Sequence, residues 1–394
     1  MTFLSKMKTK KHVFLDYASM TPIDKRVFRK MSEIQNINFA NPSALYEEAL
    51  LAKDMVSEAR KKISNILNTT SKDIIFTSGG TESNNLALLG VFESFRTKDF
   101  IPHIITSKIE HPSIIEVCEE ITRRGGEVTY LPVSSEGIVS VKDVAAAIKK
   151  NTILVSISYA NNEIGTVQPI REIGKALKEW RQKNNTTTPY LHTDACQAGL
   201  YLSIDVLKLG VDLMTLDGIK MYGPRGTGIL YVKSGIKIKP VNFGGGQERG
   251  LRSGTENVPA IAGMAEAIEM AEKMKDRESK RLLVIRDYAI DSILNNFPKS
   301  TLNGSRDFRL PNNINICFSG TDAEFAVISL GVSGISASYS SSCRTLKEDS
   351  SSYVVESLGK KDCSRSSLRF TLGRESRKSD IDKLLFALEK IVLI

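Results

Sequence analysis

The sequence predicts an α/β fold in which a mostly parallel sheet lies between layers of helices, with a smaller α+β domain beside it. Three observations lead to this class. Short β-branched runs alternate with amphipathic segments through the first two thirds of the chain, the pattern changes after Pro259, and 394 residues are enough for two domains. Sheets of this kind bind ligands at the carboxyl ends of their strands, so the residues that follow each strand are the first candidates for function.

Seven runs of β-branched and aromatic residues are predicted to form the strands of the large sheet. They are residues 73–77, 103–106, 127–131, 152–158, 190–193, 212–215 and 228–232. Amphipathic patterns between the runs predict helices, of which the clearest are 44–67, 112–124 and 170–182. Strands that alternate with helices in this way are typical of a mostly parallel sheet covered on both faces.

The last third of the chain has a different pattern. A helical segment reaches about Asn296, strands are predicted at 313–318 and 368–372, and a helix at 379–392. A stretch at 333–352 contains nine serines in twenty residues, which indicates a mobile loop. The expected large domain is therefore 14–259, and the expected small domain is 1–13 together with 260–394, including that loop.

Composition limits the classes of function. The net charge is +9, but lysine and arginine are scattered and no nucleic-acid-binding signature accompanies them, so no direct nucleic-acid partner is expected. Five cysteines without a CxxC pair argue against a disulfide framework and for a cytoplasmic protein. Cysteine and histidine have no metal-ligand spacing, so no metal is expected. No segment is typical of a signal peptide or a membrane span.

The segment 78–85, Ser-Gly-Gly-Thr-Glu-Ser-Asn-Asn, lies between a predicted strand and a predicted helix. Glycines let the backbone approach a ligand closely, and the helix N-terminus presents free N–H groups to an anion. Thr81 adds a hydroxyl. The alternative is a plain helix cap with Glu82 in its first turn. Neither GxxxxGK[ST] nor GxGxxG occurs here, which removes the best support for a nucleotide site.

Two further strand ends carry an acid and a lysine. Asp194 ends one predicted strand, and Lys220 follows another before a Gly-Pro turn. Such a lysine is usually a surface residue. A lysine that faces a carboxylate and an anion site could instead form a Schiff base with a cofactor whose pyridinium nitrogen the carboxylate keeps protonated.

Six motifs in order make the sequence similar to the cysteine desulfurases of nitrogen fixation and iron–sulfur cluster assembly. The resemblance covers nearly the whole chain, from Leu15 to Arg374. The motifs are 78–85, 110–113, 161–165, 192–197, 244–255 and 366–373. The resemblance implies a homodimer of the pyridoxal 5'-phosphate (PLP) fold type I, of aminotransferase class V, with a seven-stranded sheet.

The resemblance also implies roles for the residues that match the family's motifs. Lys220 would carry PLP, Asp194 would pair with the ring nitrogen, and His111 would stack on the ring and move protons. A lone histidine here could equally be a capping or core residue. The other matches are Gln197 at the ring hydroxyl, Gly80, Thr81 and Asp217 at the phosphate, Thr255 from the other subunit, and Asn162 and Arg369 at the substrate, with Asn162 also near the cofactor.

Cys343 matches the cysteine that receives sulfur as a persulfide. It lies in the serine-rich stretch, and a mobile thiolate could reach the substrate and then carry sulfur outward. Arg344 and Lys347 favour the thiolate, whereas Glu348 and Asp349 oppose it. The alternative is an ordinary exposed thiol. Relatives commonly have Gly-Ser-Ala-Cys-Thr-Ser where this chain has Ser-Ser-Ser-Cys-Arg-Thr.

The chain departs from the family at Asp217 and Ile219, where relatives usually have serine and histidine that help to hold the phosphate. Isoleucine cannot donate a hydrogen bond, and aspartate adds a negative charge. Two like charges about 4 Å apart repel by up to about 4 kcal/mol at an effective dielectric of about 20. The departure therefore concerns the affinity for PLP more than the class of reaction.

The expected activity is removal of sulfur from L-cysteine, which gives L-alanine and a persulfide for iron–sulfur cluster assembly or tRNA thiolation. The acceptor would be a scaffold, a carrier or a tRNA-thiolating enzyme. One alternative is a selenocysteine lyase or a related PLP-dependent lyase. Another is a degenerate, non-catalytic homologue that acts as a binding partner, for which Asp217 and Ile219 are the only hints.

Overall fold

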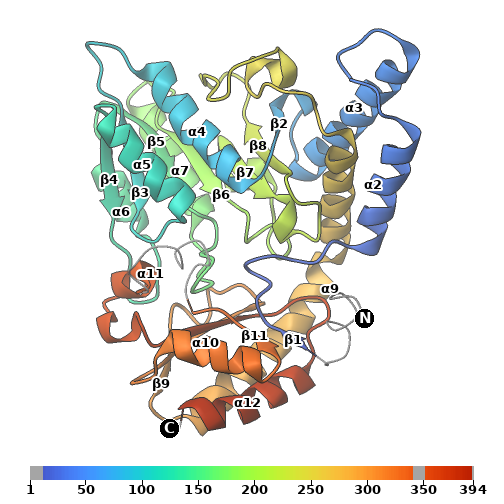
Figure 1. Ribbon diagram of the computed structural model, residues 1–394. Coiled ribbons are helices and arrows are strands. Elements are labelled where there is room, and N and C mark those ends of the chain that lie inside the picture. The colour runs from blue at the N-terminus through green and yellow to red at the C-terminus, as the bar shows by residue number, and fades with distance from the viewer. Residues whose placement is uncertain (1–11, 340–350, 393–394) are drawn as a thin grey trace.

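The computed structural model describes residues 12–339 and 351–392. Its centre is a seven-stranded sheet in the upper part of Figure 1, with the strand order β2-β8-β7-β6-β5-β3-β4. A smaller part with its own three-stranded sheet lies below it. Cys343 and most of the serine-rich stretch lie outside the described residues.

All seven predicted strands are present in the large sheet. They are β2 (Ile74–Thr77), β3 (His103–Ser107), β4 (Glu127–Leu131), β5 (Thr152–Ser156), β6 (Tyr190–Asp194), β7 (Leu213–Asp217) and β8 (Gly228–Val232). The strands β4, β3, β5, β6 and β7 run parallel, and β8 is antiparallel to both of its neighbours, β7 and β2. The predicted fold class is confirmed.

Helices cover both faces of this sheet because successive residues of each strand point to opposite sides. Ile104 packs in one buried cluster with residues of α4 (Gly80–Phe95) and α5 (Pro112–Arg123), whereas Ile105 packs in another with α7 (Ile170–Lys183). Shorter helices α6 (Val141–Ala147) and α8 (Val206–Leu209) complete the layers. The parallel strands consequently end at one sheet edge, where the turns into the helices begin.

The 39-residue helix α9 (Val258–Asn296) joins the two parts of the chain. It packs against α2 (Lys25–Ile37) and α3 (Glu47–Leu67) beside the large sheet. Its other contacts are with β9 (Ser300–Leu302), β10 (Asn313–Phe318) and α12 (Lys378–Val392), as its course in Figure 1 shows. The domain boundary predicted near residue 259 stays a prediction, because this single helix contacts both parts.

The smaller part contains the sheet β12-β10-β9, in which β12 (Ser367–Thr371) pairs antiparallel with β10. A second pair joins β1 (Val13–Phe14) to β11 (Ile335–Ser336) in parallel. This pairing ties the N-terminal segment to the smaller part. The helices here are α10 (Ala323–Val332), α11 (Tyr353–Ser357) and α12.

Although the cysteine pattern argues against a disulfide framework, one pair of cysteines is bonded. Cys317 in β10 and Cys363 in the 3₁₀ helix η4 (Lys361–Cys363) form a disulfide, with 5.4 Å between their Cα atoms. The register of β10 with β12 places Cys317 opposite Ser367, and η4 ends three residues before that strand begins. A pairing set by strand register has no local sequence signal. Cys118 and Cys196 are free.

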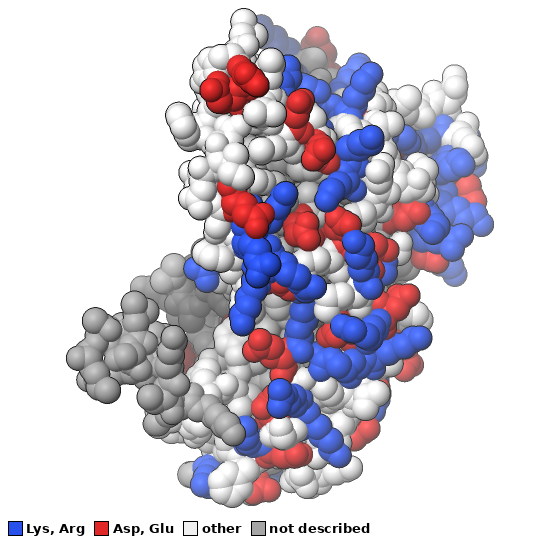
Figure 2. Space-filling model, turned by 90° about the vertical axis from the view of Figure 1, so that its right-hand side faces the viewer, with Lys and Arg blue, Asp and Glu red and all other residues white. Residues whose placement is uncertain are grey.

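Charged side chains of both signs are mixed on the face of the molecule drawn in Figure 2. Several form ion pairs on and between α3 and α9, such as Lys62 with Glu269 and Lys275 with Glu272. Among the described residues, no helix is both long enough and apolar enough to cross a membrane.

Candidate active site

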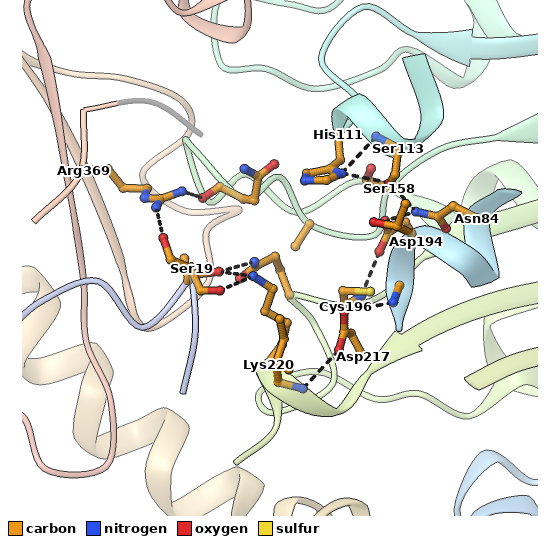
Figure 3. Close-up of a pocket in the computed structure, with 17 residues that line it drawn as sticks. Ser19, Asn84, His111, Ser113, Ser158, Asp194, Cys196, Asp217, Lys220 and Arg369 are labelled. Atoms are coloured by element: carbon orange, nitrogen blue, oxygen red, sulfur yellow. Dashed lines mark hydrogen bonds between the residues drawn. The ribbon is translucent and has the colours of Figure 1, made fainter. Parts of the chain in front are cut away.

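The ends of several strands surround one cavity of about 180 Å³ (Figure 3). Nine of the predicted site residues line it, namely Gly80, Thr81, His111, Asn162, Asp194, Gln197, Asp217, Lys220 and Arg369. Thr255 is not among the described residues that line it, and Cys343 lies outside the described residues. The chain therefore brings together residues that are almost 290 positions apart, which the motif order alone could not show.

Lys220 and Asp194 lie on different sides of this cavity. Lys220 ends the 3₁₀ helix η2 (Gly218–Lys220) after β7, and its Nζ donates to the carbonyl oxygens of Ala18 at 2.8 Å and Ser19 at 2.5 Å. Asp194 ends β6 and accepts from Nδ2 of Asn84 at 2.7 Å and from the N–H of Cys196 at 3.0 Å. These bonds fix the orientation of the carboxylate.

One buried amide oxygen beside Asp194 is left without a partner. Oδ1 of Asn84 is buried and has no hydrogen-bond partner among the described residues, although its Nδ2 donates to Asp194 and Ser113. Buried polar atoms are rarely left unpaired, because that costs free energy. A polar ligand in the cavity would supply the missing donor, so this end of the site fits a ligand with a hydrogen-bonding group, as PLP has on its ring.

His111 both caps a helix and lines the cavity. It is the N-cap of α5, and its Nδ1 accepts from the N–H of Ser113 at 3.1 Å and contacts Oγ of the same serine at 2.8 Å. Burial lowers the pKa of His111. The charge of Asp194 raises this pKa, and the charge of Lys220 lowers it further. The imidazole is therefore neutral near pH 7 and can accept a proton. The capping interpretation is confirmed, and the role of His111 at the cofactor stays a prediction.

Glu110 precedes the cavity-lining His111, and the motif 110–113 alone assigns no role to its side chain. Its side chain is 1% exposed and accepts from Oγ of Ser107 at 2.6 Å and from both the hydroxyl and the N–H of Ser158. Tyr353 in α11 donates its hydroxyl proton to the Glu110 carbonyl oxygen. Burial raises the pKa of Glu110 to about 7. This carboxyl group positions the turn that carries His111.

Glu110→Gln is expected to remove a pH dependence of stability. Because the pKa is about 7 in the folded protein against an ordinary 4.5, the folded state holds a proton that the unfolded state loses between these values. Wild-type stability contributed by this group therefore falls as the pH rises through that window, by about 3 kcal/mol in total. Melting temperatures of both proteins are measured from pH 4.5 to 8. The melting temperature of the variant relative to that of the wild type should increase as the pH rises.

Other titrating groups, including His103 and His192, are present in both proteins and cancel in that difference. The matched control is Glu93→Gln, which removes a partly exposed carboxylate from the surface of α4. A constant difference between Glu110→Gln and wild type at every pH would contradict the assignment.

Arg369 in β12 lines the cavity on the side opposite His111 and Asp194, as Figure 3 shows. Its side chain is 2% exposed, and Nη1 donates to the Asn162 carbonyl oxygen at 3.0 Å while Nη2 donates to Asp16 at 2.8 Å and Ser19 at 3.0 Å. Nε is buried and has no partner among the described residues. A guanidinium with an unpaired N–H is suited to bind a carboxylate.

Asp217 points into the N-terminus of α4. Its Oδ2 accepts from the N–H of Gly80 at 2.9 Å, and its Oδ1 accepts from the N–H of Ile219 at 3.1 Å. A Cβ at Gly80 would meet Sγ of Cys196 at 2.9 Å and Oδ2 of Asp217 at 3.2 Å, so a larger residue here would push these side chains aside. The end of the cavity at Asp194 and Asn84 fits the ring of PLP. At the predicted phosphate position, beside Gly80, lies the carboxylate of Asp217.

Comparison with known proteins gives one consistent result. The family model described as Aminotransferase class-V matches residues 13–384, which include every residue that lines the cavity. Cysteine desulfurase IscS of Dictyoglomus turgidum is 42% identical over 97% of this chain and 95% of its own length. Cysteine desulfurase IscS of Methanosarcina thermophila is 41% identical over 97% of this chain and 92% of its own length. A solved NifS-like protein has a TM-score of 0.88 at 30% identity, covering 97% of this chain and 99% of its own.

Proposed function

This chain belongs to the aminotransferase class-V family and, within it, to the cysteine desulfurases, and from that membership we propose that it transfers the sulfur of L-cysteine to its own Cys343. Enzymes of this family depend on PLP. The observation that carries the proposal is that Lys220, Asp194 and Arg369 meet at one cavity from three separate segments. Bound PLP supplies an electron sink that allows the Cα proton of an amino acid to leave.

Four residues that line the cavity have separate roles in the proposed reaction. Arg369 binds the substrate carboxylate through its unpaired Nε, beside the Asn162 carbonyl oxygen that fixes the guanidinium. Asp194 places a fixed negative charge where the ring nitrogen is expected, and Lys220 is the amine that forms the covalent link. His111 is neutral and can take a proton from the bound substrate.

The sulfur step needs one further nucleophile, which we assign to Cys343. Its thiolate attacks the sulfur atom of L-cysteine, so that a sulfur–sulfur bond forms and the substrate carbon–sulfur bond breaks. The electron pair of the broken bond stays with the carbon, which gains a proton and leaves as L-alanine. The persulfide on Cys343 then passes its outer sulfur to a scaffold, a carrier or a tRNA-thiolating enzyme.

Exposed apolar side chains support the proposed homodimer. Phe39 and Leu45, between α2 and α3, are 95% and 90% exposed, and Phe243 is 87% exposed beside the motif 244–255. Large exposed apolar side chains are a feature of surfaces that bind another protein. Thr255 would complete the phosphate site of the other subunit, which is consistent with its absence from the cavity of a single chain.

Dilution of the PLP-loaded protein to monomer is therefore expected to release PLP, because Thr255 acts across the interface. Sedimentation velocity with detection at the PLP absorption band measures subunit association and cofactor content together. A monomer that stays saturated with PLP would show that each subunit holds the cofactor alone.

The direct test of the activity uses purified protein with PLP and L-cysteine. L-alanine and protein-bound persulfide should form together. L-selenocysteine distinguishes the lyase alternative, because lyase activity that persists in Cys343→Ser would favour it. Failure to bind PLP would favour the non-catalytic alternative.

A further inference from the structure

We propose that Asp217 is an internal stand-in for the cofactor phosphate: in the cofactor-free protein its carboxylate fills the anion site at the N-terminus of α4, and PLP must displace it to bind. The inference rests on the proposed function, because it takes this anion site to be the phosphate site of PLP. It adds that the chain itself sets the affinity for its cofactor through a competing group.

The contacts of Asp217 are those that an anion makes at a helix N-terminus. Both carboxylate oxygens accept backbone N–H groups, one from Gly80 in the first turn of α4 and one from Ile219. The helix is 16 residues long, so its N-terminus favours negative charge. Cβ atoms built at Gly79 and Gly80 would meet the same carboxylate at 3.5 Å and 3.2 Å. The carboxylate thus fills the surface that the paired glycines leave open.

The surroundings of Asp217 act on its charge in opposite directions. Burial raises the pKa of Asp217, while the two backbone N–H groups and Lys220 oppose that rise and Asp194 adds to it. The thiol of Cys196 lies on the same side of Gly80, and Glu82 in the first turn of α4 is bound to other partners. A carboxylate in such a place is held less firmly than an ion-paired one, so a phosphate dianion can replace it.

Displacement has a consequence that a serine at this position would not have. The N–H groups that would bind the phosphate must first lose the carboxylate, and if Asp217 stays near the phosphate the two anions repel. Ile219 offers no side-chain donor in compensation. The cofactor-free state is correspondingly stabilised, because its N–H groups are already paired.

The test compares ligands with and without the phosphate in Asp217→Ser. Pyridoxamine 5'-phosphate and pyridoxamine are suitable probes, because neither forms a Schiff base with Lys220. The variant should bind pyridoxamine 5'-phosphate about tenfold more tightly than wild type and pyridoxamine with unchanged affinity, as measured by titration calorimetry. The control Glu93→Gln, which removes a negative charge elsewhere on α4, should change neither affinity.

A second readout is independent of affinity. Without ligand, Asp217→Ser should melt a few degrees below wild type because two N–H groups lose their acceptor, and saturating pyridoxamine 5'-phosphate should remove that difference. Wild-type affinity for this probe should also fall more steeply with rising pH than that of the variant. If the serine variant does not fold, Asp217→Asn keeps the size, removes the charge and should shift affinity in the same direction.

Unchanged or weaker binding of pyridoxamine 5'-phosphate by both variants would overturn the inference, because Asp217 would then help to hold the phosphate. That result leaves the proposed function intact. Wild-type protein that binds neither PLP nor pyridoxamine 5'-phosphate would instead contradict the proposed function itself, so the two failures are distinguishable.

Discussion

Replacing Cys343 by alanine is expected to abolish the protein-bound persulfide and to lower L-alanine production from L-cysteine by about three orders of magnitude. The reason is that, in the proposed step, the substrate carbon–sulfur bond breaks as the Cys343 thiolate accepts the sulfur. The groups that we propose to bind PLP and the substrate carboxylate are Lys220, Asp194 and Arg369, which line the cavity and are unchanged in this variant. The PLP absorption band and its response to added L-cysteine should therefore be unchanged.

The matched control is Cys118→Ala, which removes a buried free thiol from α5 and should retain persulfide formation. Alanine production at the wild-type rate in Cys343→Ala would show that another group receives the sulfur. The measurements are L-alanine by chromatography and persulfide by alkylation and mass spectrometry.

Replacing Lys220 by alanine is expected to remove the covalent link to PLP and to lower desulfurase activity by about three orders of magnitude or more. Wild-type protein loaded with PLP should show a visible absorption band, and borohydride reduction should fix the cofactor to the peptide that contains Lys220. Among the described residues, no other lysine lines the cavity.

Lys233→Ala is the control for this variant, because Lys233 follows β8 of the same sheet but pairs with Asp212. It should keep the band and the activity. A borohydride adduct that peptide mass spectrometry places on a different lysine would contradict the assignment of Lys220.

The strands of the large sheet could be predicted because buried parallel strands are continuous β-branched runs between turn residues. The predicted limits of β4 and β8 match the observed ones. The run 152–158 was predicted too long by two residues, since Ser158 leaves the sheet to bond with Glu110. Such a contact between residues 48 positions apart has no local signal, so the motif 110–113 could be recognised without the contacts of the Glu110 carboxyl group.

The site could be predicted as a set of residues but not as an arrangement. The resemblance to the family identified the candidate site residues. The structure brings nine of these residues, including Lys220, to one cavity. The direction of the Asp217 side chain depends on the turn geometry after β7 and on the N-terminus of α4, which come together only in the folded chain. The disulfide of Cys317 and Cys363 likewise follows from strand register. The sulfur acceptor, the homodimer and the cytoplasmic location stay predictions.

A single-turnover measurement decides whether the sulfur of L-cysteine passes to Cys343. PLP-loaded protein is mixed with one equivalent of L-cysteine without reductant, quenched and digested, and the peptides are weighed by mass spectrometry. We expect equal molar amounts of L-alanine and of a peptide in which Cys343 is heavier by one sulfur atom. Sulfur found on Cys196 or another cysteine, or L-alanine formed without any persulfide, would contradict it.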